Sequence, residues 1–254
     1  MKRVGLIGLG YWGKVINEKL EKFCDVKFTC QSKDTYIDRL DEVDWVVVAT
    51  PNDTHYVTVR NCISAGKNVF CEKPLTPTEE QSKLLFDYAE KKGIKLYVDD
   101  IQNYRDYDFE IMEHNLVERR KSGGGDIKNI LYVLTYHDIY ILYKYIKNSE
   151  IENVILIDNK NRLHFKVKFM EYPYFRQKVV ENDITIEFLY DLNYEKVEHY
   201  INGCSLRGED DILFKMLLGV FNEEVDFEYN KKISLFTNRV IDILNNKLFK
   251  EIVV

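Results

Sequence analysis

The feature that most constrains this chain is the glycine-rich segment Gly8-Leu9-Gly10-Tyr11-Trp12-Gly13, which has the pattern G-x-G-x-x-G. It directly follows an apolar run, residues 2–7, that indicates a buried strand, and it leads into a helical pattern. In this context the first glycine permits a tight turn, the second lets the backbone approach a pyrophosphate, and the third lets helix and strand pack closely. Amide groups at the start of the helix then offer donors to the anion. The segment predicts a dinucleotide-binding unit.

The rest of the first hundred residues alternates between strand and helix patterns. The run VDWVVVAT, residues 43–50, predicts a strand buried on both faces, as in parallel sheets covered by helices. Thr78 and Gly93 are a plausible start and stop for one helix. The expected strands are residues 2–7, 26–30, 43–50, 68–71 and 95–98, with helices at 54–65 and 78–92. This alternation predicts an N-terminal doubly wound parallel sheet, a Rossmann domain over residues 1–100.

The pattern changes after residue 100, where residues 101–254 predict a second α/β domain for substrate binding and oligomerisation. Its β-branched and aromatic runs favour a mostly antiparallel, open sheet. We expect strands at 127–136, 155–157, 164–169, 184–190 and 196–201, and helices at 111–121, 137–147, 210–221 and 234–245. The last helix is a candidate for packing back on the first domain.

Composition excludes several classes of protein. The net charge of −6 argues against a nucleic-acid binder, which would usually be basic. No window approaches the ~20 apolar residues of a membrane helix, so no membrane association is expected. The five cysteines include no C-x-x-C pair, which favours reduced thiols and a cytoplasmic location over a disulfide framework. No histidine pair has metal-ligand spacing, so no metal site is expected.

The choice of cofactor stays open between NAD and NADP. A classical NAD site places an acid about 20 residues after the glycine loop, at the end of the second strand. This sequence has F-T-C-Q-S-K there, without an acid. Ser32 and Lys33 could instead receive a 2′-phosphate, and the alternative is that both are simply loop residues.

Three further motifs follow the predicted strands in order. They are ATPNDTH at residues 49–55, CEKPL at 71–75 and KLYVDDIQNYR at 95–105. Together with IGLGYWGK at residues 7–14, they resemble the Gfo/Idh/MocA family of NAD(P)-dependent oxidoreductases over residues 1–105. GYWGK is similar to bacterial members that oxidise nucleotide-linked sugars.

The resemblance implies a Rossmann domain joined to an α/β domain whose open sheet forms the substrate wall and often a homo-oligomer interface. It also implies that the lysine of E-K-P, Lys73, faces the nicotinamide and the reacting hydroxyl, after a Lys73–Pro74 bond that is typically cis. The alternative is that Lys73 is a solvated charge on the protein surface without a role in the reaction. The cofactor-binding positions carried over are Gly8, Gly10, Tyr11, Trp12, Gly13, Thr50, Pro51, Asn52, His55 and Glu72.

The second half departs from the family pattern D-x-x-x-H. His137 fits the histidine, but Val133 stands where the aspartate is expected. His137 could accept the hydroxyl proton while Lys73 supports the oxygen, or it is a helix-capping or core residue. Asp138 could orient His137 or replace the missing acid, or it complements the helix dipole. Tyr104 and Arg105 are candidate substrate-binding residues; for Arg105 the alternative is a surface ion pair.

These motifs predict an enzyme that moves a hydride between NAD(P) and a carbinol or ketone carbon of a small carbohydrate: a sugar, cyclitol or nucleotide-linked sugar. An imine or biliverdin-like reductase is the nearest enzymatic alternative. A non-catalytic dinucleotide-binding regulator or assembly subunit is the alternative outside enzymes, because Val133 breaks the family pattern and the second domain is short for the family.

Overall fold

The computed structural model describes residues 1–31, 35–105, 107, 109–120, 130–158, 162–171, 184–191, 198–206 and 211–249. The chain divides into two compact units. The first unit holds residues 1–104 and 210–239, and the second unit holds residues 105–209 and 240–254. The two domains expected from the sequence, divided near residue 100, stay a prediction; the compact units differ from them because residues 210–239 belong with the N-terminal part.

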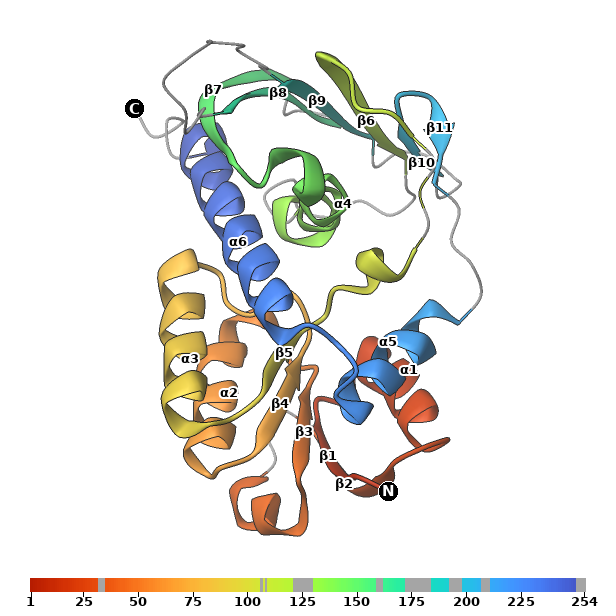
Figure 1. Ribbon diagram of the computed structural model, residues 1–254, viewed down its shortest axis with the longest axis vertical. Coiled ribbons are helices and arrows are strands. Elements are labelled where there is room, and N and C mark those ends of the chain that lie inside the picture. Colours follow the sequence, from red (N-terminus) through yellow and green to blue (C-terminus); the bar gives the residue numbers. More distant parts are fainter. Residues whose placement is uncertain are drawn as a thin grey trace. The chain divides into compact units, whose positions relative to one another are not determined.

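The first unit contains a five-stranded parallel sheet (Figure 1). Its strands lie in the order β2-β1-β3-β4-β5, and every neighbouring pair is parallel. The strand order reverses between β1 and β3, which is where open α/β sheets bind ligands beyond the carboxyl ends of their strands. The bounds are β1 Arg3–Ile7, β2 Asp25–Cys30, β3 Trp45–Val48, β4 Asn68–Cys71 and β5 Leu96–Val98. The predicted doubly wound sheet is confirmed.

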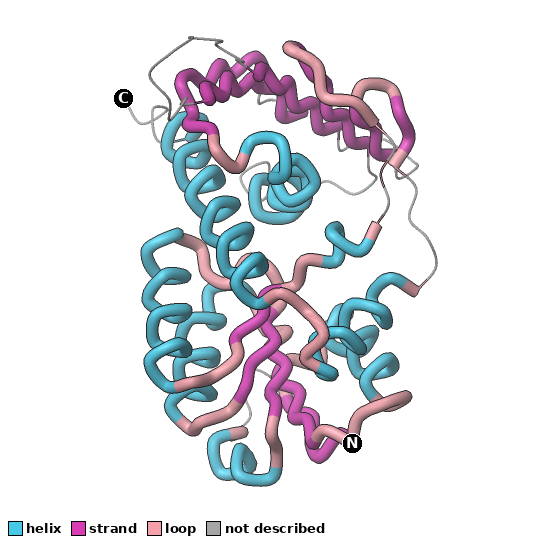
Figure 2. The backbone as a smooth tube through the Cα atoms, in the orientation of Figure 1, coloured by secondary structure: helices cyan, strands magenta, loops and turns pink. Residues whose placement is uncertain are grey.

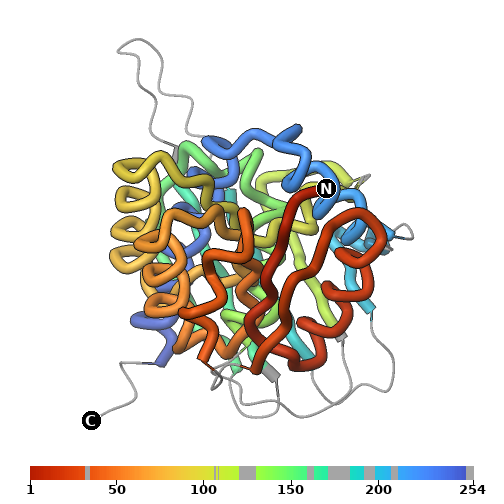
Figure 3. Tube along the Cα trace, turned by 90° about the horizontal axis from the view of Figure 1, so that it is seen from below, coloured from red at the N-terminus to blue at the C-terminus, as the bar shows by residue number. Residues whose placement is uncertain are grey.

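Helices cover both faces of this sheet. Figure 3, seen from below, shows α1 on one side of the strands and α2 and α3 on the other. α1 (Tyr11–Leu20) and α5 (Ile212–Asn222) share one apolar cluster with the strands, and α2 (His55–Ser64) and α3 (Glu79–Lys92) share the other. Successive strand residues alternate between the two clusters, as a period of two requires. Burial on both faces explains the continuous valine run in β3.

Helix α3 begins and ends where the sequence predicts. The Thr78 hydroxyl accepts a hydrogen bond from the Gln81 amide at 3.3 Å, and Gly93 ends the helix at φ +66°. A left-handed residue at this position favours glycine, which has no Cβ to collide with the preceding carbonyl.

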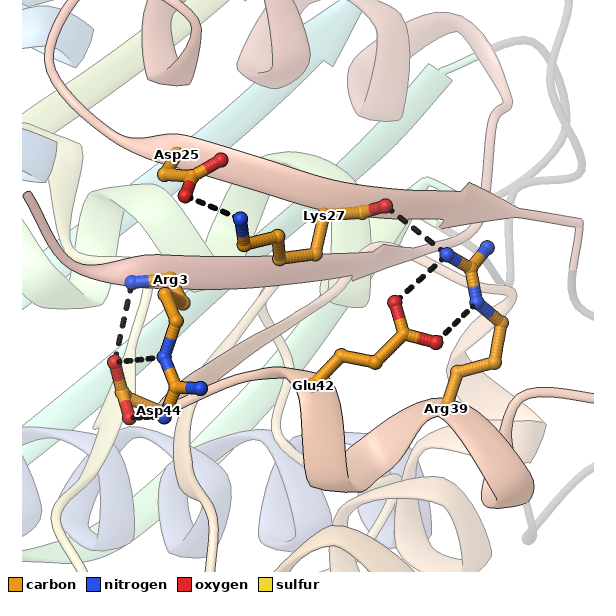
Figure 4. A network of polar contacts seen from close by, with 6 residues as sticks. All are labelled: Arg3, Asp25, Lys27, Arg39, Glu42 and Asp44. Atoms are coloured by element: carbon orange, nitrogen blue, oxygen red, sulfur yellow. Dashed lines mark hydrogen bonds and ion pairs between the residues drawn. The ribbon is translucent and has the colours of Figure 1, made fainter.

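Polar contacts fasten the short 3₁₀ helix η1 (Ile37–Glu42) and the loop before β3 to the edge of the sheet (Figure 4). Arg39 donates two hydrogen bonds of 2.9 Å to Glu42 and one of 3.0 Å to the carbonyl oxygen of Lys27. Arg3 donates to Asp44 through its backbone amide at 3.2 Å and through Nε at 3.1 Å. Exposed pairs of this kind contribute little to stability, so their effect is to fix the geometry of these loops.

The second unit contains a six-stranded sheet in the order β11-β10-β6-β9-β8-β7. Only the β6–β9 pair is parallel among its pairings, so the predicted mostly antiparallel open sheet is confirmed. Figure 2 shows these strands in magenta above helix α4. The bounds are α4 Tyr136–Ile146, β6 His114–Arg120, β7 Ser149–Asp158, β8 Arg162–Glu171, β9 Ile184–Asp191, β10 Glu198–Ile201 and β11 Cys204–Ser205.

Two local predictions in the second unit are wrong. Residues 111–121 were expected to be helical, but β6 runs through them, and its burial alternates between buried Asn115, exposed Leu116 and buried Val117. Residues 127–136 were expected to be a strand, but Leu131–Thr135 form a π-helical segment, η5, that continues into α4. A short apolar run that is buried has no distinguishing period, so the sequence pattern cannot separate strand from helix there.

The C-terminal helix α6 (Phe227–Phe249) is longer than the predicted 234–245 and has residues in both units. Across the described ranges, no helix combines the length and the apolar character needed to cross a membrane.

Candidate functional site

The loop between β1 and α1 needs its first and third glycines for space and conformation. Gly8 has φ +106°, and a Cβ there would lie 2.4 Å from the carbonyl oxygen of Ala49. A Cβ on Gly13 would lie 1.8 Å from the carbonyl oxygen of Gly8. Both are far inside van der Waals contact, so any side chain would push α1 away from the sheet. These two glycines therefore serve the close turn and the close helix packing that the sequence predicted.

Gly10 differs, because no atom of the described residues lies within 4 Å of the position a Cβ would take. It faces a pocket of about 470 Å³ at the carboxyl end of β1. The absence of a side chain leaves this backbone open to a ligand, and the first amides of α1 have no partners within the helix. The pocket is lined by Gly8, Leu9, Gly10, Tyr11, Trp12, Gln31, Ala49, Thr50 and Pro51. An open glycine cradle beside unpaired helix amides fits the pyrophosphate of a dinucleotide.

Two aromatic side chains extend from this loop. Tyr11 is 78% exposed and Trp12 is 54% exposed, and their rings meet edge to face at 5.6 Å. Large exposed aromatics on the rim of a pocket offer apolar surface to a ligand. On the far rim, Gln31 follows β2. Ser32 and Lys33, predicted for the cofactor's 2′-position, lie outside the described residues.

The segment after β3 is fixed by buried hydrogen bonds. Thr54 Oγ1 donates to Thr50 Oγ1 at 2.8 Å, while Pro51 and Asn52 are exposed. His55 is fully buried, and its Nε2 lies 2.8 Å from the Thr50 carbonyl oxygen. Its Nδ1 lies 2.8 Å from the carbonyl oxygen of Pro74. Both ring nitrogens are thus occupied by backbone, so His55 ties this segment to the turn after β4 and offers no nitrogen to a cofactor.

Burial also controls the charge of His55. Removal from water lowers its pKa, against the smaller opposing effects of the two carbonyl contacts. The ring is therefore neutral near pH 7 and can donate one hydrogen bond at most.

The turn after β4 carries Lys73, which is half-buried. Its peptide bond to Pro74 is cis, as the family resemblance implied. The Glu72 amide donates to the Val48 carbonyl oxygen at 2.8 Å, which fixes the start of the turn against β3. Because all five strands are parallel, the ends of β1, β3 and β4 share one edge of the sheet, and Lys73 follows that edge.

Two carboxyl groups lie beside this lysine at the ends of neighbouring strands. Glu72 follows β4, and Asp99 follows β5, where it is 7% exposed. Because Cys71 pairs with Val98, the next residues along each strand, Glu72 and Asp99, lie side by side. Burial raises the pKa of both, and the charge of Asp99 raises the pKa of Glu72 still further. The sequence prediction included Glu72 but missed Asp99, whose only signal was its place directly after a predicted strand.

The next carboxyl group, Asp100, is tied into a separate chain of hydrogen bonds. It accepts from the Tyr97 hydroxyl at 2.6 Å and from the Asn103 amide at 3.0 Å. Burial raises the pKa of Asp100 to about 6 despite these donors. Tyr104 lies at the end of this chain, with its hydroxyl 3.3 Å from that of Tyr97. Tyr104 is therefore held within the first unit, and its predicted substrate contact stays a prediction.

In the second unit, Asp138 is the centre of a buried charge network. Arg119 donates to both of its oxygens, at 2.9 and 3.0 Å through Nε and at 2.6 Å through Nη2. The Tyr190 hydroxyl donates to Oδ2 at 2.8 Å, and His199 Nε2 lies 2.9 Å from Oδ1. Asp138 has no exposed surface. This environment does not suit the predicted catalytic acid, because every side of the carboxylate is already engaged.

The charge balance of this network rests on Arg119. Burial alone would raise the pKa of Asp138, but the charges of Arg119 and His199 hold it below its usual value. Burial lowers the pKa of His199, so its own charge is small near neutral pH. Arg119 is consequently the main partner that keeps Asp138 ionised.

The remaining predicted residues have less defined surroundings. His137 precedes Asp138 on α4 and is half-buried. Arg105 begins the second unit, and its Nε is buried with no hydrogen-bond partner among the residues that the structure describes. Their predicted roles as proton acceptor and substrate ligand stay predictions. Within the residues that the structure describes, no group of three or more His, Cys, Asp or Glu side chains is arranged to hold a metal ion.

Comparison with known proteins connects the first unit to one family. Residues 15–100, about a third of the chain, match an oxidoreductase family with an NAD-binding Rossmann fold. An uncharacterized oxidoreductase of Schizosaccharomyces pombe is 46% identical over 68 residues, which are 26% of this chain and 18% of that protein. The scyllo-inositol 2-dehydrogenase (NADP(+)) IolW of Bacillus subtilis is 43% identical over 56 residues, 22% of this chain and 16% of that protein. The chain thus aligns with less than a fifth of either relative.

The likeness in three dimensions extends further. The structure of the UDP-N-acetylglucosamine 3-dehydrogenase GnnA from Acidithiobacillus ferrooxidans superposes with a TM-score of 0.73. The match covers 94% of this chain and 97% of that chain at 15% identity. At that identity the comparison shows a shared fold.

Proposed function

We propose that this chain, whose N-terminal part belongs to the Gfo/Idh/MocA family of oxidoreductases, is an NAD(P)-dependent dehydrogenase of small carbohydrates. It would move a hydride between the nicotinamide and a carbinol or ketone carbon of a sugar, cyclitol or nucleotide-linked sugar. The relatives named for an inositol and for a nucleotide sugar support this substrate class.

The observation that carries the proposal is an amine on the same sheet edge as the glycine loop. Gly8, Gly10 and Gly13 open that edge to a pyrophosphate, and Lys73 follows the end of β4 on it. A protein that only binds a dinucleotide has no evident need for an amine there. The regulator, the alternative outside enzymes, is favoured by Val133 at the family's aspartate position, where it is 43% exposed.

The chain's own residues have distinct proposed roles. The loop amides bind the pyrophosphate, and the segment of Thr50, Pro51 and Asn52 borders the nicotinamide. When bound, the nicotinamide supplies the hydride chemistry. Lys73 donates a hydrogen bond to the substrate oxygen, and His137 is the proposed acceptor of the hydroxyl proton.

Substitution of Lys73 tests the proposal. Purified protein is incubated with NADH or NADPH and a panel of sugars, cyclitols and nucleotide sugars, and cofactor fluorescence is followed. Lys73→Met should bind cofactor and lose turnover, whereas Lys83→Met, an exposed lysine on α3, should match the wild type. Turnover that survives in Lys73→Met removes this amine from the mechanism, and binding without turnover on any panel member favours the regulator.

The type of cofactor, the oligomer and the location are the finer parts of the proposal. Lys33→Glu should weaken NADPH binding and leave NADH binding nearly unchanged if Lys33 faces a 2′-phosphate. Homo-oligomerisation through the open sheet and a cytoplasmic location, the latter from the cysteine pattern, complete the proposal.

A further inference from the structure

The ends of β4 and β5 bring two carboxyl groups together by strand register. Cys71 pairs with Val98, so the next residues, Glu72 and Asp99, leave neighbouring strands side by side. The Asp99 amide donates to the Cys71 carbonyl oxygen at 2.8 Å, which continues the ladder to this point. Side chains at paired positions of neighbouring parallel strands lie on the same face of the sheet, so the two carboxyl groups are neighbours. Two carboxyl groups can hydrogen-bond directly only when one of them carries a proton.

Local contacts indicate which group carries the proton. Asp99 Oδ1 also accepts a hydrogen bond of 2.9 Å from the Ile101 amide, an interaction that favours the ionised form. Asp99 therefore suits the acceptor position, and Glu72 suits the donor position.

We propose that Glu72 and Asp99 share one proton, carried by Glu72, and that the pair is a positioning element that presents a single negative charge to the Lys73 amine. An ammonium group beside one negative charge stays ionised and able to donate a hydrogen bond to a substrate oxygen. The catalytic importance of the pair rests on the proposed function, whereas the shared proton does not.

The other titratable groups around the pair do not change this balance. Burial raises the pKa of the Cys71 thiol well above its ordinary value, so the thiol adds no charge. The carboxyl group of Asp100 accepts hydrogen bonds from the Tyr97 hydroxyl and the Asn103 side-chain amide. Lys73 is the cation that acts on both carboxyl groups.

Infrared spectroscopy of the cofactor-free protein tests the shared proton directly. A protonated carboxyl group has a carbonyl band separate from that of ionised carboxylates. We expect this band to persist at pH 8, where Asp100, with a pKa of about 6, no longer contributes. Glu72→Gln should remove the band, while Glu80→Gln, an exposed control on α3, should leave it unchanged. A missing band in the wild type, or a band that survives in Glu72→Gln, overturns the assignment.

Stability gives a second readout that needs no substrate. Because folding raises the pKa of Glu72, its contribution to stability is present below the ordinary glutamate pKa and is lost as pH rises toward the folded value. The unfolding equilibrium constant of the wild type should rise by up to tenfold per pH unit in that interval. Glu72→Gln, whose amide mimics the protonated carboxyl, should flatten this dependence. An equal slope in both proteins contradicts a proton on Glu72.

Kinetics test the effect on Lys73 once a substrate is known. The double variant Glu72→Gln, Asp99→Asn removes the negative charge of the pair, so the basic limb of the pH profile of kcat should move to lower pH by about one unit or more. An unchanged profile refutes the positioning role. If the protein has no turnover at all, the proposed function fails, while the infrared and stability results still decide the shared proton.

Discussion

Replacement of Asp138 separates a structural role from the catalytic role that the sequence suggested. Asp138→Asn keeps the shape of the side chain but removes its charge. The Arg119 side chain, which is 14% exposed, would then have no counter-charge. The amide group of the new asparagine would also point an N–H toward Arg119 or Tyr190, which both donate hydrogen bonds at this position. The variant tests whether this carboxylate is needed for folding.

The expected magnitude follows from the burial of both partners. Breaking a buried ion pair by removing one partner costs about 3–5 kcal/mol, because the remaining charge is left uncompensated. Arg119 keeps some contact with water, so we expect the lower end, about 3 kcal/mol. For a chain of this size, that loss lowers Tm by roughly 6–12 °C.

The stability difference between Asp138→Asn and the wild type should also depend on pH in a definite direction. The folded state holds the pKa of Asp138 below its usual value, so its contribution to stability is present above the unfolded pKa and disappears as pH falls through the folded value. The difference between Asp138→Asn and wild type should therefore be constant near neutral pH and shrink below about pH 4, the ordinary aspartate range.

Urea unfolding followed by circular dichroism measures the change, with Glu150→Gln, exposed on β7, as control. The double variant Asp138→Leu, Arg119→Met should be less destabilised than either single variant, because no unpaired charge remains. Wild-type stability in Asp138→Asn together with lost turnover would refute this reasoning and restore Asp138 as a catalytic acid. Strict additivity in the double variant would show that the two residues are not coupled.

Two glycine substitutions and one histidine substitution test the dinucleotide site. Gly13→Ala should lower stability by about 1–3 kcal/mol, because the new Cβ would lie 1.8 Å from the Gly8 carbonyl oxygen; thermal unfolding measures it. Gly10→Ala meets no protein atom, so it should fold normally but weaken NADH binding at least tenfold in a fluorescence titration; normal binding would mean that no ligand approaches there. His55→Leu should cost about 1–3 kcal/mol, since the buried carbonyl oxygen that accepts from the ring loses its donor, and unaltered urea unfolding would contradict that.

The first unit was largely predictable because its signals are local. The glycine loop, the valine run of β3 and the cap residues Thr78 and Gly93 each act within one turn or one strand. The structure confirms these elements and the doubly wound sheet they imply. Local propensity and global fold agree here, which is the condition under which sequence reasoning succeeds.

The second unit was less predictable because its elements depend on distant partners. β6 lies between β9 and β10, and both strands come later in the chain, so residues 111–121 gave no local sign of pairing. Asp138 looked like an ordinary first-turn acid. Its partners Arg119, Tyr190 and His199 come from three different strands, and no spacing in the sequence connects them.

Asp99 was missed for a related reason, although its signal was present. Residues that directly follow adjacent parallel strands meet at one edge, so Glu72 and Asp99 are neighbours once β4 and β5 are known to pair. The sequence gives the strands but not their order. A prediction of the pair therefore needs the sheet topology.

The Glu72–Asp99 pair also bears on whether this chain is an enzyme or a binding protein. Burying carboxyl groups costs stability, and apolar or neutral replacements at such sites are often neutral or stabilising. The double variant Glu72→Gln, Asp99→Asn keeps amide donors and acceptors in place, including the acceptor for the Ile101 amide. Its unfolding free energy should therefore equal or exceed that of the wild type above neutral pH, with little pH dependence, in urea titrations. An enzyme would lose turnover in exchange, because Lys73 would face no charge, whereas a dinucleotide-binding regulator has no turnover to lose. A double variant that is strongly destabilised at alkaline pH would show that the charge serves the fold, and the link between this pair and catalysis would then fail.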